Sequence, residues 1–127
     1  MTKAPSFDRI LAQLSCSDIG GSRLWFEKFF GRAPDAEPMA GLSEWRHQKA
    51  AGLQLFENAD NAGRGTLTVI VSDLRAEHAR TEALGLNPGP IEAATTTSLV
   101  RLHDPDGNLV VLAQPDEAEG KARRIKQ

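Results

Sequence analysis

Two short runs of the sequence carry side chains that can bind or transform a small molecule. Trp45-Arg46-His47 and Arg101-Leu102-His103 each lie in a segment of alternating polar and apolar residues, which predicts a β-strand. The alternation places the first and third residues of each run on the same face of its strand. A tryptophan can stack on a planar ligand, an arginine can pair with an anion, and a histidine can act as a general base.

Each of these roles has a structural alternative. Trp45 could instead seal a dimer interface, and the arginines of both runs could lie on an outer sheet surface. His78 falls in a predicted helix and is expected on the surface of that helix. The single cysteine, Cys16, lies on the apolar side of a predicted strand, so we expect a buried thiol rather than a nucleophile.

The segment Asp104-Pro-Asp-Gly-Asn108 predicts a tight turn between β-rich runs at 98–103 and 108–113. The proline fixes φ at the first central position, and Gly107 can take the positive φ that a tight hairpin needs. By itself this pattern predicts a hairpin and nothing more.

The chain contains an internal repeat at an offset of 55 residues. Residues 14–19 and 69–74 are both alternating strands that end in Ser-Asp and precede a helical pattern, with Asp18 matching Asp73. The same shift sends Gly107 to Gly52. Each half therefore predicts a β-α-β-β-β module.

These modules predict an α+β fold in a single domain, residues 1–127, with modules at about 9–57 and 65–114 and a tail at 115–127. Strands are expected at 9–17, 36–39, 42–49, 53–57, 66–72, 91–94, 98–103 and 108–113, with a helix after the first strand of each half. One helix cannot cover both sides of a four-stranded sheet. We therefore expect two curved, mostly antiparallel sheets, side by side, that enclose a concave surface in which a ligand pocket is expected.

Composition and charge exclude several partners. The net charge of −2, with dispersed Lys and Arg, gives no electrostatic footprint for nucleic acid. The basic run 121–126 follows an acidic segment and predicts a solvated tail. No apolar run is long enough to span a membrane, the N-terminus has no signal-peptide core, and one cysteine excludes an internal disulfide. A cytoplasmic location is expected.

Four motifs together resemble the vicinal-oxygen-chelate superfamily, which includes glyoxalase I, bleomycin-resistance proteins, fosfomycin-modifying transferases and ring-cleaving dioxygenases. The resemblance covers residues 9–114. It is carried by Ser17-Asp18, Phe26-Glu27-Lys28 with Gly31, Val71-Ser72-Asp73 and Asp104-Pro-Asp-Gly-Asn108. It implies paired βαβββ modules, a U-shaped sheet cavity and usually a homodimer.

The resemblance also implies four metal-ligand positions, in the first and last strands of each module. In this sequence they are occupied by Leu11, Phe56, Thr66 and Val111. None offers the imidazole or carboxylate donors that a divalent metal site needs. A register error of one residue would offer Gln13, Glu57, His47 or His103, which come from different strand phases and are not expected to converge. We expect no metal and no other cofactor, so the Lewis-acid chemistry of the superfamily loses its electrophile.

The sequence therefore predicts a glyoxalase/bleomycin-resistance-like protein that binds a small, drug-like or aromatic molecule in a metal-free cavity, with antibiotic sequestration as its role. The pocket candidates are Leu11, Gln13, Trp45, His47, Phe56, Thr66, Thr68, Arg101, His103 and Val111. A homodimer is expected to cover an apolar flank at the Trp45/Phe56 side. The alternative is a metal-independent or divergent lyase, isomerase or dioxygenase-type enzyme, with a histidine as base and Arg101 as oxyanion partner.

Overall fold

The alternating runs of each half form four strands and one helix in the computed structural model, which describes residues 4–116. The first half contains β1 (Ile10–Cys16), α1 (Ile19–Phe30), β2 (Ala36–Met39), β3 (Leu42–His47) and β4 (Ala51–Glu57), followed by the short 3-10 helix η1 (Ala59–Asn61). The second half contains β5 (Thr66–Ile70), α2 (Leu74–Ala83), β6 (Glu92–Ala93), β7 (Thr97–His103) and β8 (Leu109–Pro115). Every expected strand is present, within a few residues of its predicted bounds.

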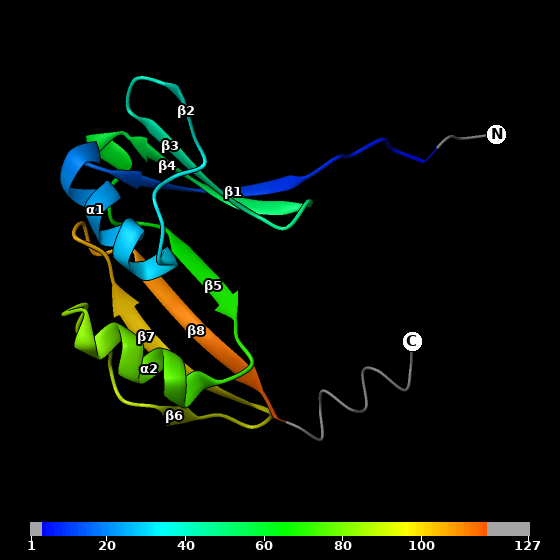
Figure 1. Ribbon diagram of the computed structural model, residues 1–127, viewed down its shortest axis with the longest axis vertical. Coiled ribbons are helices and arrows are strands. Elements are labelled where there is room, and N and C mark those ends of the chain that lie inside the picture. Colours follow the sequence, from blue (N-terminus) through cyan, green and yellow to red (C-terminus); the bar gives the residue numbers. More distant parts are fainter. Residues whose placement is uncertain (1–3, 117–127) are drawn as a thin grey trace.

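The strands form two four-stranded sheets with the same internal order (Figure 1). The orders are β1-β4-β3-β2 and β5-β8-β7-β6. In each sheet the first strand pairs with the last in parallel, and the other neighbours are antiparallel. Both helices lie on the same side of the molecule, each against its own sheet. This arrangement confirms the predicted α+β class and the paired βαβββ modules.

The two helices begin in the same way. The Asp18 side chain accepts a hydrogen bond from the backbone N–H of Gly20 at 3.2 Å, and that of Asp73 accepts one from Ala76 at 3.1 Å. A carboxylate at the N-cap satisfies a backbone donor that the helix itself leaves unpaired. The predicted equivalence of Asp18 and Asp73 is confirmed.

The predicted equivalence of Gly52 and Gly107 is wrong. Gly52 pairs with Leu11 inside the first sheet, whereas Leu109 pairs with Thr66, the counterpart of Leu11 in the second. The last strands therefore correspond at an offset of 57 rather than 55 residues. The reason is that the segment from the start of α2 to the matching positions of β7 is two residues longer than the segment from the start of α1 to those of β3. Gly107 lies in the turn before β8 with φ at +93°.

Gly52 has a different reason to be a glycine. A Cβ at this position would lie 2.5 Å from the Trp45 carbonyl oxygen and 2.9 Å from Leu11 Cδ2. The residue is required by close packing between β1, β3 and β4 rather than by a turn.

The sides of the sheets that face the helices form one apolar core. Its largest part is an aromatic cluster in which the Trp45 ring lies 6.0 Å from Phe26 and 5.4 Å from Phe30, measured between ring centroids. The second helix contributes less apolar surface, and only Leu74 and Thr81 of α2 are buried.

The second helix is joined to the first by an arginine. The guanidinium of Arg80 donates hydrogen bonds to the carbonyl oxygens of Lys28 at 3.1 Å and Phe29 at 2.6 Å. These carbonyls lie in the last turn of α1, where helical C=O groups lack partners within their own helix. A positive charge there is also favoured by the helix dipole.

The predicted turn at residues 104–108 joins the two halves. The Asn108 side chain is fully buried and donates hydrogen bonds to the Ser15 carbonyl oxygen at 2.9 Å and to Asp104 Oδ2 at 2.7 Å. Its own oxygen accepts the Gly65 N–H at 2.8 Å. Asn108 therefore connects β1, the linker between the halves and its own turn.

Asp106 adds a second connection from the same turn. Its carboxylate accepts hydrogen bonds from the Ser17 backbone N–H at 3.1 Å and from the Ser17 and Ser22 hydroxyls at 2.5 and 3.3 Å. The turn thus holds the end of β1 and the start of α1, and so fixes how the two sheets meet.

Within residues 4–116, no helix is long and apolar enough to cross a membrane. Most of the expected tail, from residue 117 onward, lies outside the described residues, as does the start of the expected lead-in at residues 1–3.

Candidate binding face

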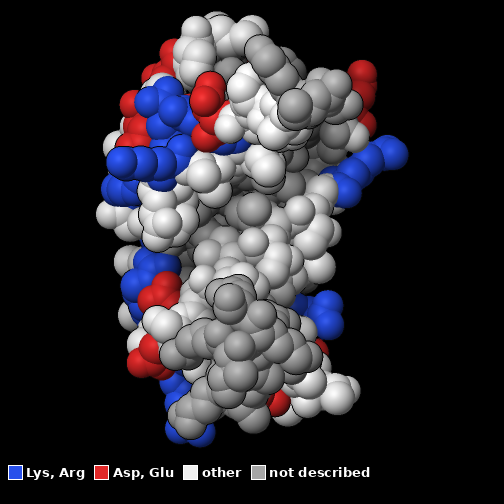
Figure 2. All heavy atoms as spheres, turned by 90° about the vertical axis from the view of Figure 1, so that its right-hand side faces the viewer, with Lys and Arg blue, Asp and Glu red and all other residues white. Residues whose placement is uncertain are grey.

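The sides of the two sheets that point away from the helices form what we call the open face. Paired residues of neighbouring strands lie on the same side of a sheet, so the strand registers assign each side chain to a side. The open face carries Leu11, Gln13, Glu44, Arg46, Gln54 and Phe56 from the first sheet, and Thr66, Thr68, Ile70, Arg101, His103, Leu109 and Val111 from the second. Figure 2 views the molecule from the side away from the helices and shows a largely uncharged middle bordered by charged groups.

Eight of the ten pocket candidates lie on this face. They are Leu11, Gln13, Phe56, Thr66, Thr68, Arg101, His103 and Val111. The structure thus brings together, on one surface, side chains that come from both halves. Their role in binding stays a prediction.

Trp45 does not lie on the open face, and its predicted role as a stacking platform or dimer anchor is wrong. Its side chain is 1% exposed and packs against α1. The indole N–H donates a hydrogen bond to the Arg32 carbonyl oxygen at 3.0 Å, so the ring is satisfied inside the core. The alternation of residues correctly predicted that Trp45 and Glu44 point to opposite sides of β3, but it did not predict which side packs against α1.

His47 lies on the same side of β3 as Trp45 and is also wrongly placed among the pocket candidates. It is exposed at the end of the strand, beside the turn to β4. A hollow lined only by residues 47–51 of this turn is present there, and neither Arg101 nor His103 lines it.

The corrected offset also changes which residue of the first half matches Val111. Thr68 pairs with Val111 in the second sheet, and its counterpart Gln13 pairs with Gln54 in the first. The residue equivalent to Val111 is therefore Gln54, not Phe56, whose counterpart is Ala113.

A hydrogen-bonded row crosses the open face of the first sheet. Gln13 Nε2 donates to Gln54 Oε1 at 3.3 Å, and Gln54 Nε2 donates to Glu44 Oε1 at 3.1 Å. Arg46 Nε donates to the other oxygen of Glu44 at 2.7 Å, and Arg9 lies 3.8 Å from the same oxygen. These contacts, the Arg46 hydrogen bond foremost, hold the pKa of Glu44 below its usual value although the carboxylate is buried.

Glu44 was not among the candidate site residues predicted from the sequence. A carboxylate at an alternating strand position is usually exposed, so its own position gave no sign of burial. The available signal was Arg46, which comes two residues later on the same side of the strand and neutralises it.

The equivalent row of the second sheet contains Thr68, Val111 and Arg101. Arg101 Nε donates to Glu92 Oε2 at 3.0 Å, and both side chains are partly exposed, by 49% and 39%. Thr68 is exposed and Val111 is half-buried. This row carries apolar and hydroxyl groups beside one arginine, and it is not closed by a network such as that around Glu44.

The open face does not offer the donor set of a metal site. Leu11, Thr66 and Val111 occupy three of the positions implied by the superfamily, and Gln54 occupies the fourth after the register correction. One hydroxyl and one neutral amide cannot replace imidazole and carboxylate ligands. Glu44, the nearest carboxylate in the row, is already engaged by Arg46. Among residues 4–116, no three His, Cys, Asp or Glu side chains lie close enough together to hold a metal ion.

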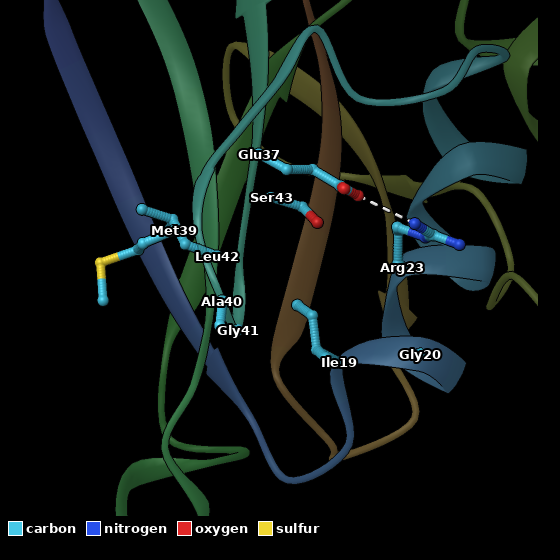
Figure 3. A pocket seen from close by; sticks show the side chains of 9 residues that line it. All are labelled: Ile19, Gly20, Arg23, Glu37, Met39, Ala40, Gly41, Leu42 and Ser43. Atoms are coloured by element: carbon cyan, nitrogen blue, oxygen red, sulfur yellow. Dashed lines mark hydrogen bonds and ion pairs between the residues drawn. The ribbon is translucent and has the colours of Figure 1, made fainter.

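A second hollow, of about 240 Å³, lies between the start of α1 and the β2–β3 turn (Figure 3). Arg23 of α1 and Glu37 of β2 meet across it, with 2.8 Å between Arg23 NH1 and Glu37 Oε1. Because the ion pair uses both charged side chains of its lining, this hollow is not the binding site that we assign.

The thiol of Cys16 is buried in the core. Burial raises the pKa of Cys16 to about 11, which keeps the group as a neutral thiol at physiological pH. It is an inert core residue, as predicted.

No model of a known protein family matches the sequence, and no curated protein sequence matches it. Solved structures do match the fold. A glyoxalase/bleomycin resistance protein from Catenulispora acidiphila aligns with a TM-score of 0.77 at 24% sequence identity, over 84% of this chain and 96% of that chain.

Two further structures are similar to a comparable degree. TnmS3, an antibiotic-binding protein from a Streptomyces species, has a TM-score of 0.77 at 20% identity, over 91% of this chain and all of that chain. A bleomycin-binding protein in complex with bleomycin has a TM-score of 0.72 at 18% identity, over 86% of this chain and 99% of that chain. The chain therefore has the same fold as these glyoxalase- and bleomycin-resistance-type structures, which is the fold that its motifs predicted.

Proposed function

We propose that this protein binds a small aromatic or drug-like molecule on the open face, without a metal, and sequesters it rather than transforming it. The observation that carries the proposal is the set of residues at the four metal-ligand positions, Leu11, Gln54, Thr66 and Val111. They form an apolar surface with a few neutral hydrogen-bonding groups, which suits a ligand-binding site and not a Lewis-acid centre.

The structural neighbours support the same proposal. TnmS3 is an antibiotic-binding protein and another neighbour was solved with bleomycin bound, so this fold holds such molecules elsewhere. An antibiotic or a related aromatic metabolite is therefore the ligand that we propose for this chain.

A homodimer would complete the site. On the open face of one chain Ile70 is 65% exposed, and the other large apolar side chains of this face are half-buried, namely Leu11, Phe56, Leu109 and Val111. Surfaces of this kind usually mark a partner, and a two-fold pair is the commonest arrangement. We propose that a second copy covers this face and leaves a ligand cavity between the chains. Phe56 of the expected apolar flank lies on this face together with Ile70, whereas Trp45 is in the core.

A thermal-shift screen over antibiotics and aromatic acids tests the proposal. A ligand that binds only the folded protein should raise the Tm with concentration by mass action. Thr68→Trp would fill the open face and should abolish the shift. Glu82→Trp adds the same ring on an exposed position of α2 and should leave the shift intact. The proposal fails if no compound stabilises the protein or if both variants respond alike, and sedimentation at micromolar concentration tests the dimer.

An enzymatic alternative rests on one observation. Arg101 and His103 lie two residues apart on the open face, where they could act as an oxyanion partner and a general base. If the alternative holds, a ligand found in the screen should incorporate deuterium from heavy water, and His103→Gln should stop the exchange. Sequestration predicts no incorporation with either protein.

A further inference from the structure

Arg101 is held in a way that leaves part of its guanidinium available. Glu92 receives a hydrogen bond from Nε, and among residues 4–116 the two terminal nitrogens have no hydrogen-bond partner. These nitrogens form the edge of the guanidinium that can bind a carboxylate or sulfonate with two parallel hydrogen bonds. Glu92 thus orients the group without occupying that edge.

The charge of the open face differs from that of the whole chain. The ionic groups in its two clusters are three arginines and two glutamates, which gives a net charge of +1, whereas the chain as a whole carries −2. Both glutamates are already paired with arginine. An anion approaching this face therefore meets no unpaired carboxylate from these clusters.

The two halves are not equivalent in this respect. Glu44 is the counterpart of Arg101 in the first sheet, because Gln54 and Val111 are equivalent and pair with them. Glu44 is buried and engaged by Arg46 and Gln54. In the second half the exposed charge is Arg101, whose side chain is 49% exposed, and apolar Val111 lies next to it, whereas Arg46 of the first half, 44% exposed, belongs to the polar network around Glu44.

We infer that the natural ligand carries one anionic group on an apolar, aromatic body, and that Arg101 is the residue that selects for that group. The body would lie over Val111 and Leu109, and the carboxylate or sulfonate would bind the free edge of Arg101. This inference rests on the proposed function and names its ligand class.

Two fluorescent probes of nearly the same shape test it. Anilinonaphthalene sulfonate carries one negative charge, and N-phenylnaphthylamine has the same ring system without it. The wild-type protein should bind the anionic probe about tenfold more tightly, since a charge-assisted hydrogen bond is worth about one power of ten or more in affinity. Arg101→Gln should remove this preference while binding of the uncharged probe stays within about twofold.

Arg75→Gln provides the matched control, because Arg75 is an exposed arginine on α2, on the opposite side of the second sheet. It should leave the preference unchanged. If the wild type binds both probes equally, or if Arg101→Gln and Arg75→Gln have the same effect, the inference is wrong although the binding site stands. If neither probe binds, the inference is wrong, and the thermal-shift screen decides separately whether the proposed function stands. Circular dichroism of each variant confirms that it is folded.

Discussion

The two equivalent rows of the open face have the same backbone and opposite chemistry. In the first sheet Gln13, Gln54 and Glu44 form a chain of hydrogen bonds that ends at an arginine. In the second sheet the same positions hold Thr68, Val111 and Arg101, and within residues 4–116 only the arginine of this row is paired. The first row is therefore fixed by its own contacts, and the second is the row that we propose for ligand binding.

The helix sides of the two sheets differ in a related way. The first half packs an aromatic cluster from α1 against Trp45, and Arg80 of the second half donates to carbonyl groups of α1. Both halves share one apolar core, in which the first half alone contributes an aromatic cluster, and Arg80 adds polar contacts between the two helices. A repeat keeps its backbone because packing and caps demand it, while positions free of those demands can diverge.

The largest expected effect separates the two sides of the first sheet. Trp45→Ala should destabilise the protein by about 3–5 kcal/mol, because it leaves a large cavity in the aromatic cluster and removes a buried hydrogen bond. Val111→Ala, on the open face, should cost about 1 kcal/mol or less since the side chain is only half-buried. Urea unfolding measures both. Similar costs for the two variants would contradict the assignment of Trp45 to the core.

The next effect concerns the connection between the halves. Asn108→Ala should cost about 2–3 kcal/mol, because Gly65 N–H and the Ser15 carbonyl lose their buried partner. Asn58→Ala is the control, since Asn58 is exposed and its side chain does not cap η1, and it should lie within about 0.5 kcal/mol of wild type. If the two asparagine variants unfold at the same urea concentration, the turn does not hold the sheets together.

A smaller effect is expected for the arginine that joins the helices. Arg80→Met keeps most of the apolar stem and removes the hydrogen bonds to the last turn of α1, so it should cost about 1 kcal/mol. Arg75→Met removes an exposed arginine from the same helix and should be close to neutral. Hydrogen exchange should show faster exchange around the end of α1 in the first variant only. Equal protection in both would exclude this role for Arg80.

Most of the fold could be predicted from the sequence because its signals are local. Strand alternation, the N-caps Asp18 and Asp73 and the turn at 104–108 each depend on a few adjacent residues. The offset of 55 residues held through the caps and failed afterwards, because the second half has two extra residues between the start of α2 and the matching positions of β7. That error misplaced both Gly52 and Phe56 in the comparison of the halves.

The site was harder to predict because it depends on which side of each strand meets a helix. Trp45 and Glu44 are neighbours on β3 and point to opposite sides, and composition alone favours neither. Burial of Glu44 follows from its contact with Arg46 and Gln54, and Gln54 comes from another strand. Tertiary contacts of this kind are not encoded in the period of one segment.

The smallest effect compares the two buried carboxylates, Glu44 in the first half and Asp104 in the second. The hydrogen bond from Arg46 lowers the pKa of Glu44 below the ordinary value of 4.5. The ionised Glu44 therefore stabilises the folded protein above pH 4.5, and this stabilisation is lost as the pH falls through the pKa that Glu44 has in the folded protein. Burial raises the pKa of Asp104 above the ordinary value of 3.8. The protonated Asp104 therefore stabilises the folded protein fully below pH 3.8, and this stabilisation is lost as the pH rises through the pKa that Asp104 has in the folded protein.

The difference in unfolding free energy between wild type and Glu44→Gln should therefore grow with pH over the acidic range. The corresponding difference for Asp104→Asn should shrink over that range. Urea unfolding at a series of pH values measures both slopes, and slopes of the same sign would show that the two carboxylates are not in the opposed environments described for them.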